Sequence, residues 1–206
     1  LNEHGIPNVE ADVTFLDLGE QDDARKEVLR ARELDPLSPT ICTAVGWVHY
    51  LCGEVDTALR ELNAALEVEP GFAWLSHVLG HAHLQAGNSA ESEHFFRKAV
   101  EATDRAPFFL AGLGYGLGAS GKADAARRVL EELRERAREE YVSAEQMASV
   151  HVGLDDSNAA FEALERAVAE RSACMIYVAV DPQYALVHRD PRFTGLRQRM
   201  NEGIRS

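Results

Sequence analysis

The chain has 206 residues, 46% of them hydrophobic and 27% charged, which is ordinary usage for a folded globular protein. Its 21 Lys and Arg stand against 34 Asp and Glu, and the net charge of −13 excludes a general nucleic-acid binder, because neutralising phosphates requires a basic face. No apolar run approaches the roughly 18 residues that a membrane-spanning helix needs, and three cysteines without a Cys-x-x-Cys pair favour a reducing compartment, so we expect a cytoplasmic chain without membrane contact.

A repeat of 34 residues runs through most of the sequence. Gly19, Gly53, Gly87 and Gly121 are each 34 residues apart, and the next step falls on Asp155. A second column of small residues has the same spacing, at Gly46, Gly80, Gly114 and Ala148. This phase predicts five tandem units without an insertion, at 5–38, 39–72, 73–106, 107–140 and 141–172.

Each unit predicts two helices joined by a tight turn. In the second unit, apolar side chains recur at helical spacing over 40–52, stop at Gly53, and resume over 55–68 before Pro70. A Gly just past a helix end closes the last turn in the left-handed conformation, and Asp is a tolerated substitute. The first helices of the five units are expected at 5–18, 39–52, 73–86, 107–120 and 141–154.

The period, the small residue within the first helix, the turn Gly, the Ala in the second helix and the closing Pro resemble the tetratricopeptide repeat family. The resemblance covers about four-fifths of the chain. It implies an all-α fold, a right-handed superhelix of helical hairpins, in which the first helices line a concave groove and the second helices form the convex back.

The sequence departs from this pattern at two kinds of position. Asp12 stands where a small residue is usual, so we expect an irregular first helix in the opening unit. The third to fifth units carry Asp104, Arg138 and Ser172 in place of the closing Pro. Because Pro is what disfavours further helix in the second unit, we expect these second helices to extend, most visibly through 131–140.

The last segment, 173–206, is expected to cap the open end of the repeat, because a repeat unit cannot bury its faces alone. Asp181-Pro182 and Asp190-Pro191 each place Asp before Pro, which predicts two helix starts. An apolar stripe at three- and four-residue spacing follows them, at Phe193, Leu196 and Met200.

The stretch from Tyr141 through Asp190-Pro191-Arg192-Phe193 is similar to the end of repeat regions that follow effector domains in bacterial signalling proteins. In those relatives the effector is a winged-helix DNA-binding domain, a serine/threonine kinase or a nucleotide cyclase. The chain opens at Leu1 without a Met or a signal peptide. We therefore expect a fragment whose effector domain lies upstream.

One glycine-rich motif suggests a dinucleotide ligand, but its position in the repeat explains it better. Gly116-Leu-Gly118-Ala-Ser-Gly121 fits G-x-G-x-x-G, but a predicted helix precedes it where a dinucleotide site needs a strand, so no cofactor is expected. The extra glycines indicate either a locally soft helix, which we favour, or a place where another backbone comes close.

The histidines fall into two groups. His49, His83 and His151 share one repeat column and are expected to be partly buried with a satisfied ring nitrogen. His77 and His81 form an i, i+4 pair that could contact a metal ion, but no further ligand stands nearby. We favour a polar patch for a ligand or a pH-sensitive contact over a metal site.

Aromatic residues gather on the predicted first helices, where they would anchor a bound segment or pack against neighbouring helices. The expected groove residues are Thr43, Trp47, Tyr50, Trp74, His77, His81, Phe108, Ala111 and Tyr115. None of the first-helix stretches contains Lys or Arg, so the basic residues with which relatives clamp an acidic chaperone tail are missing. An apolar or aromatic segment with basic flanks fits the negative chain better.

No nucleophile motif or phosphate-binding loop accompanies these features, and we expect no enzyme activity. The sequence favours a non-catalytic scaffold that binds a protein segment or its own upstream effector domain. The alternative is a sensor whose groove holds a small ligand or, less favoured, a metal. Self-association is compatible with either, since an exposed apolar end of a repeat array is adhesive.

Overall fold

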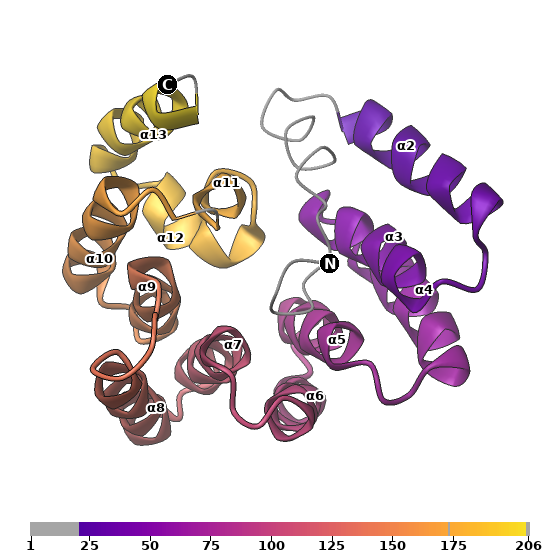
Figure 1. The fold of residues 1–206 in the computed structure, drawn as a ribbon, viewed down its shortest axis with the longest axis horizontal. Coiled ribbons are helices and arrows are strands. Elements are labelled where there is room, and N and C mark those ends of the chain that lie inside the picture. The colour runs from indigo at the N-terminus through magenta and orange to yellow at the C-terminus, as the bar shows by residue number, and fades with distance from the viewer. Residues whose placement is uncertain (1–20, 173, 205–206) are drawn as a thin grey trace. The chain divides into compact units, whose positions relative to one another are not determined.

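A computed structural model describes residues 21–172 and 174–204, and the regular structure among them is entirely helical (Figure 1). The chain divides into two compact units, residues 1–104 and 105–206. Asp12, Gly19 and the predicted first helix at 5–18 lie outside the described residues. No helix in the described part is long and apolar enough to cross a membrane.

The described part of the N-terminal unit, from residue 21, contains one leading helix and two helical hairpins. The helices are α2 (Gln21–Leu34), α3 (Pro39–Leu51), α4 (Val55–Val68), α5 (Ala73–Gln85) and α6 (Ser89–Ala102). Gly53 and Gly87 lie at the hairpin turns with φ of 76° and 82°, a conformation that favours Gly. The small-residue column has a packing reason, because a Cβ on Gly46 would lie 2.4 Å from the side chain of Leu62.

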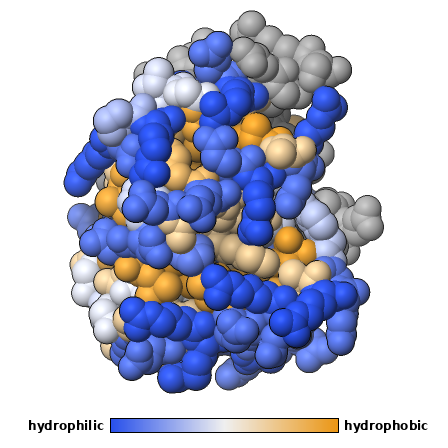
Figure 2. Space-filling view, turned by 90° about the vertical axis from the view of Figure 1, so that its left-hand side faces the viewer, coloured by the Kyte–Doolittle hydropathy of each residue, from blue (hydrophilic) through white to orange (hydrophobic). Residues whose placement is uncertain are grey.

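The C-terminal unit contains two further hairpins followed by short helices. The hairpin helices are α7 (Pro107–Ala119), α8 (Ala123–Arg136), α9 (Ala144–Gly153) and α10 (Ser157–Ala169). Gly121 and Asp155 occupy the turns with φ of 79° and 59°, as the repeat predicts. The helices α8 and α10 are amphipathic, and the side of the unit that carries them is mostly hydrophilic, with hydrophobic side chains showing between (Figure 2).

The expected extension of the later second helices is wrong. The second helices α6 and α8 have 14 residues each and α10 has 13, against 14 for α4, whose unit does carry the Pro. Asp104, Arg105 and Arg171 take positive φ of 48°, 61° and 54° just past two of these helices, and the left-handed turn ends each helix without a Pro.

One of the extra glycines of α7, Gly118, has the second explanation that the sequence offered, a place where another backbone comes close. The helix runs without a break over Pro107–Ala119. A Cβ on Gly118 would lie 2.6 Å from the backbone carbon of Gly153, and one on Gly153 would lie 2.4 Å from the carbonyl oxygen of Tyr115. Glycine is needed here because the backbones of α7 and α9 come into close contact.

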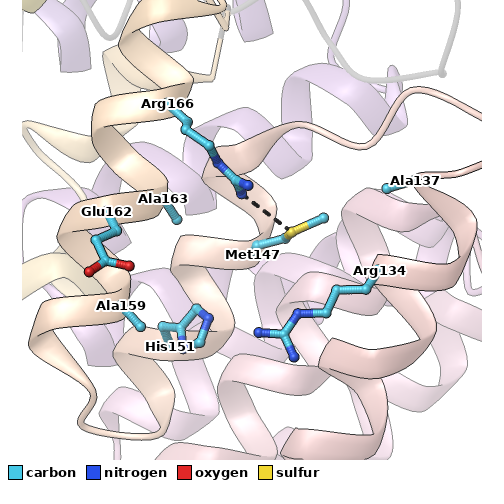
Figure 3. A pocket seen from close by; sticks show the side chains of 8 residues that line it. All are labelled: Arg134, Ala137, Met147, His151, Ala159, Glu162, Ala163 and Arg166. Atoms are coloured by element: carbon cyan, nitrogen blue, oxygen red, sulfur yellow. Dashed lines mark hydrogen bonds between the residues drawn. The ribbon is translucent and has the colours of Figure 1, made fainter.

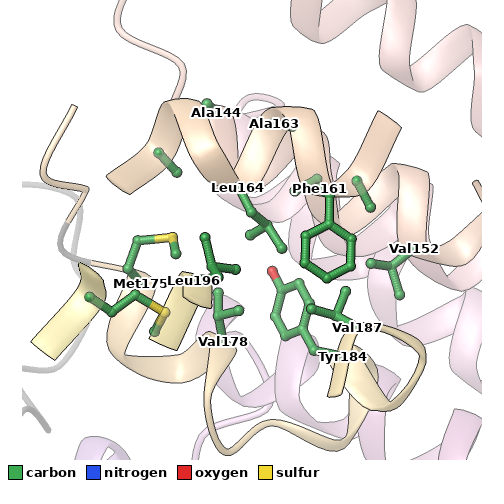
Figure 4. Packing of buried hydrophobic residues seen from close by; sticks show 14 residues of the cluster. Ala144, Val152, Phe161, Ala163, Leu164, Met175, Val178, Tyr184, Val187 and Leu196 are labelled. Carbon is green, nitrogen blue, oxygen red and sulfur yellow. The ribbon is translucent and has the colours of Figure 1, made fainter. Parts of the chain in front are cut away.

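The C-terminal segment, residues 174–204, packs against α9 and α10. It forms α11 (Met175–Val178), the 3₁₀ helix η1 (Pro182–Tyr184), α12 (Ala185–His188) and α13 (Arg192–Ile204). Asp181 caps η1 through its carboxylate and Pro182 takes the first helical position, which confirms that predicted start. Apolar side chains of the segment, among them Val178, Tyr184 and Leu196, join one core with α9 and α10 (Figure 4).

Candidate functional site

The residues predicted to line a groove differ in their accessibility. Phe108 and Tyr115 are half-buried. The remaining members each expose less than a tenth of their surface, at Thr43, Trp47, Tyr50, Trp74, His77, His81 and Ala111. Within the described structure, Phe108 and Tyr115 are therefore the members of this set whose side chains keep part of their surface accessible.

Most of the buried members belong to one aromatic cluster in the N-terminal unit, formed by Trp47, Tyr50, His77, His81 and Phe96. The rings of Trp47 and Tyr50 stack with centroids 4.9 Å apart. The ring of His81 lies edge-on to Trp47 at 5.9 Å and to Phe96 at 4.9 Å. Edge-to-face and offset contacts of this kind stabilise a core beyond the area that they bury. The cluster thus joins α3, α5 and α6.

The two histidines of the aromatic cluster are neutral at neutral pH. Burial lowers the pKa of His77 to about 3, and it lowers the pKa of His81 well below the ordinary value, with the neighbouring His77 adding to the effect. Their Nε2 atoms lie 3.2 Å apart, so one ring donates and the other accepts. Among the described residues, no group of three or more His, Cys, Asp and Glu could hold a metal ion, and a pair supplies too few ligands for zinc.

In the C-terminal unit, the predicted residues lie on α7. Ala111 is buried, and the ring of Phe108 contacts that of Phe109 with centroids 5.2 Å apart. Tyr115 packs against the core that α9 and α10 share with the C-terminal segment. Burial raises the pKa of Tyr115, and the charge of Asp181 raises it further. The chain's own C-terminal segment therefore occupies part of the surface next to Tyr115.

A buried polar contact that the sequence analysis did not predict joins α9 to the C-terminal segment. The Tyr184 hydroxyl donates a hydrogen bond to the carboxylate of Glu145, and both residues are buried. Burial raises the pKa of Glu145 to about 7, against the lowering effect of the Tyr184 hydrogen bond, and the nearby Asp181 raises it further. Burial also raises the pKa of the Cys174 thiol to about 12. Glu145 and Tyr184 therefore form a structural contact, and Cys174 is not an activated nucleophile, because a raised pKa keeps its thiol protonated.

The histidine column behaves as expected at two of its three positions. The Nδ1 atom of His49 lies 2.6 Å from a carboxylate oxygen of Glu54, and the Nδ1 atom of His83 lies 3.5 Å from the side-chain amide nitrogen of Asn88. The Nδ1 atom of His151 is buried without a hydrogen-bond partner in the described part of the chain, since the nearest Asp156 oxygen is 3.9 Å away. The expectation of a satisfied ring nitrogen is therefore not met at Nδ1 of His151.

His151 lies in a pocket between α8, α9 and α10, here called the arginine pocket, with a volume of about 330 Å³ (Figure 3). The lining residues are Arg134, Ala137, Met147, His151, Ala159, Glu162, Ala163 and Arg166. Arg166 donates a hydrogen bond to the sulfur of Met147 at 3.7 Å. Sequence reasoning missed this pocket, because its arginines come from two different second helices and no sequence motif joins them.

Sequence models of the tetratricopeptide repeat match residues 75–104 and 107–132. No curated protein matches the sequence. These two segments therefore carry tetratricopeptide repeats at the sequence level.

Solved structures with the same fold include a thermophilic tetratricopeptide repeat protein of Thermus thermophilus, with a TM-score of 0.63 and 16% identity over 96% of this chain and 97% of that one. A tetratricopeptide repeat protein from Parabacteroides merdae gives a TM-score of 0.51 at 12% identity, over 95% of this chain and 78% of that one. The Cut9–Hcn1 hetero-tetramer of the APC/C gives 0.58 at 16% identity, over 95% of this chain and 38% of that one. These similarities and the helical hairpins confirm the predicted all-α repeat class.

Proposed function

We propose that this chain is a non-catalytic interaction module that binds a protein segment through the first helices of its hairpins. Tetratricopeptide repeats generally mediate protein–protein interactions, and stacked repeats present extended binding surfaces. The observation that carries the proposal is the first-helix face of α7, where Phe108 and Tyr115 are half-buried aromatic side chains and the helix has no Lys or Arg. Aromatic side chains surrounded by apolar surface often contribute most of the binding energy when a peptide is recognised.

The partner favoured by this surface is an apolar or aromatic segment with basic flanks. Its aromatic residue would pack beside Phe108 and Tyr115, and its basic residues would be attracted by the net charge of −13. We further propose that the partner lies within a bacterial signalling protein of the kind that the sequence of the C-terminal third suggests, and that it can be an effector domain of the same polypeptide. An effector of the winged-helix, kinase or cyclase type would then be regulated by what the repeats bind.

The test is binding to a panel of immobilised peptides that carry one aromatic residue between basic or neutral flanks. Wild-type protein should bind the aromatic peptides, more tightly with basic flanks at low salt. Phe108→Ala and Tyr115→Leu should weaken binding about tenfold while helicity stays unchanged. Tyr141→Ala is the matched control, because this aromatic side chain is 69% exposed and lies outside the first helices. Undiminished binding by Phe108→Ala would contradict the proposed surface.

A second candidate is a sensing module for a small molecule. The arginine pocket favours it, because its volume of about 330 Å³ falls in the range of small-ligand sites, roughly 300–1,000 Å³. Native mass spectrometry of the purified protein distinguishes the two functions. A retained small mass supports sensing, and a bare chain that binds peptides supports the interaction module.

A further inference from the structure

The arginine pocket has a lining that the protein-interaction function does not explain. It lies wholly within the C-terminal unit, between two second helices and one first helix. The side chains of Arg134 and Arg166 approach from α8 and α10 on either side of Met147 (Figure 3). Both guanidinium groups line the same cavity, so an anion bound there would be attracted by two positive charges.

The two arginines differ in their partners within the described part of the chain. Arg134 forms an ion pair with Glu131 at 3.5 Å, but both side chains are at least half exposed, so solvent weakens the pair. Arg166 donates a side-chain hydrogen bond to the Met147 sulfur, which is a weak acceptor. Elsewhere in the same unit, Arg105 binds Glu132 at 2.6 Å. Because the Arg134 pair is weak and Arg166 donates to a weak acceptor, both guanidinium groups can bind an incoming acceptor.

The other polar members of the lining do not compensate the two positive charges. The carboxylate of Glu162 points away from both guanidinium groups (Figure 3). Burial lowers the pKa of His151, and Arg134 and Arg166 lower it further, against the raising effects of Asp156 and Glu162. The imidazole is therefore neutral at neutral pH and serves as a hydrogen-bonding group.

The floor of the pocket is apolar. Met147 and Ala163 are buried beneath the arginines, and Ala159 also lines the cavity. An unbranched thioether beside two small alanines of α10 leaves room for a flat apolar group. A ligand that fits both parts has one anionic head and one compact apolar body.

We propose that the arginine pocket binds a small organic oxyanion, a carboxylate or a phosphate ester, with its charged head between Arg134 and Arg166 and its apolar body on Met147. A planar guanidinium presents paired donors that match the oxygens of either group. The site is separate from Phe108 on α7, so it can be tested independently of peptide binding.

The test is calorimetric titration of the full chain with benzoate, phenyl phosphate, benzyl alcohol and benzylamine, which share an apolar ring and differ in charge. We expect binding of at least one anion and none of the alcohol or the amine. Tighter binding of phenyl phosphate identifies a phosphate ester as the natural class, and tighter binding of benzoate identifies a carboxylate. Benzyl alcohol binding as tightly as the anions would overturn the charge recognition, and failure of both anions to bind would overturn the site.

Single substitutions test whether the anion binds in the arginine pocket. Arg134→Gln and Arg166→Gln should each weaken the anion about tenfold or more, because hydrogen bonds between charged groups are the strong ones. Arg128→Gln is the matched control on α8, since it removes the same charge from outside the lining. Phe108→Ala should bind the anion as the wild type does, whatever it does to peptide binding. Equal losses in the control and in Arg166→Gln would show a general charge effect and overturn the proposal.

Discussion

The two units place different titratable residues at the same position of the 34-residue repeat. His77 in α5 and Glu145 in α9 are two periods apart, and both are buried. Burial disfavours the charged form of each, so the pKa of His77 falls and the pKa of Glu145 rises. The histidine is neutral at pH 7, whereas the carboxyl group with a pKa of about 7 is only half neutral there.

The surroundings of the two residues explain the difference. His77 lies among rings contributed by helical hairpins, whereas Glu145 lies under the C-terminal segment, where Tyr184 donates to it. One repeat position therefore supports two kinds of interior. In the N-terminal unit it packs against rings of its own hairpin, and in the C-terminal unit it attaches a segment that lies outside the repeat.

The largest expected effect comes from removing the side chain that seats the C-terminal segment. Tyr184→Ala deletes a ring with no exposed surface and leaves Glu145 without its donor. We expect a loss of about 3–5 kcal/mol in the free energy of unfolding of the C-terminal unit, as for other buried aromatic truncations. Urea unfolding measures this loss, and hydrogen exchange should show reduced protection in α9 and α10 first.

Tyr141→Ala is the control, because its exposed ring should change stability by less than about 0.5 kcal/mol. If Tyr184→Ala unfolds no more easily than this control, the C-terminal segment does not stabilise α9.

The second prediction concerns pH, where the two units should respond in opposite directions. The folded-state pKa of Glu145 is raised from 4.5 to about 7, so the folded C-terminal unit binds the extra proton and its stability falls as the pH rises between these values, by about 3 kcal/mol. The folded-state pKa of His77 is lowered from 6.5 to about 3, so the unfolded chain binds the extra proton. The N-terminal unit therefore loses stability as the pH falls below about 6.5.

Glu145→Gln separates the two effects. The amide oxygen still accepts from Tyr184 but does not titrate, so the decline of the C-terminal unit between pH 5 and pH 7 should disappear while the acid sensitivity of the N-terminal unit stays. Hydrogen exchange across this pH range, corrected for the intrinsic exchange rate, follows each unit by its own peptides. A pH profile that Glu145→Gln leaves unchanged would show that Glu145 is not the titrating group.

The helical hairpins could be predicted from the sequence because their causes are local and repeat. Gly53 and Asp155 mark turns by the conformation that they allow, and the small residue at Gly46 marks contact with a bulky partner in the same hairpin. The helix ends after α6 and α10 were predicted too late, because residues other than Pro end a helix when they adopt positive φ, as Asp104 and Arg171 do.

The sites could not be predicted to the same degree, because they depend on contacts between distant segments. Trp47 and His81 are one repeat apart, so their spacing places them on the same face of two first helices. It does not say whether other segments cover that face, and in the structure both side chains are buried. The path of the C-terminal segment over Glu145 has no periodic signal. Arg134 and Arg166 stand on different hairpins, and no motif joins them.

The smallest expected effect concerns the hairpin turns, where Asp155 replaces the glycine of the other units. Gly53, Gly87 and Gly121 take the left-handed conformation without strain, whereas Asp155 takes it at φ of 59° with a side chain. Asp155→Gly should therefore stabilise the C-terminal unit by about 0.5–1 kcal/mol, less the entropy that Gly gains in the unfolded chain. Gly121→Asp is the reverse change in the same unit and should destabilise it by a similar amount. Thermal unfolding of both variants measures the pair, and a loss of stability in Asp155→Gly would mean that the Asp155 side chain stabilises its turn by more than its conformation costs.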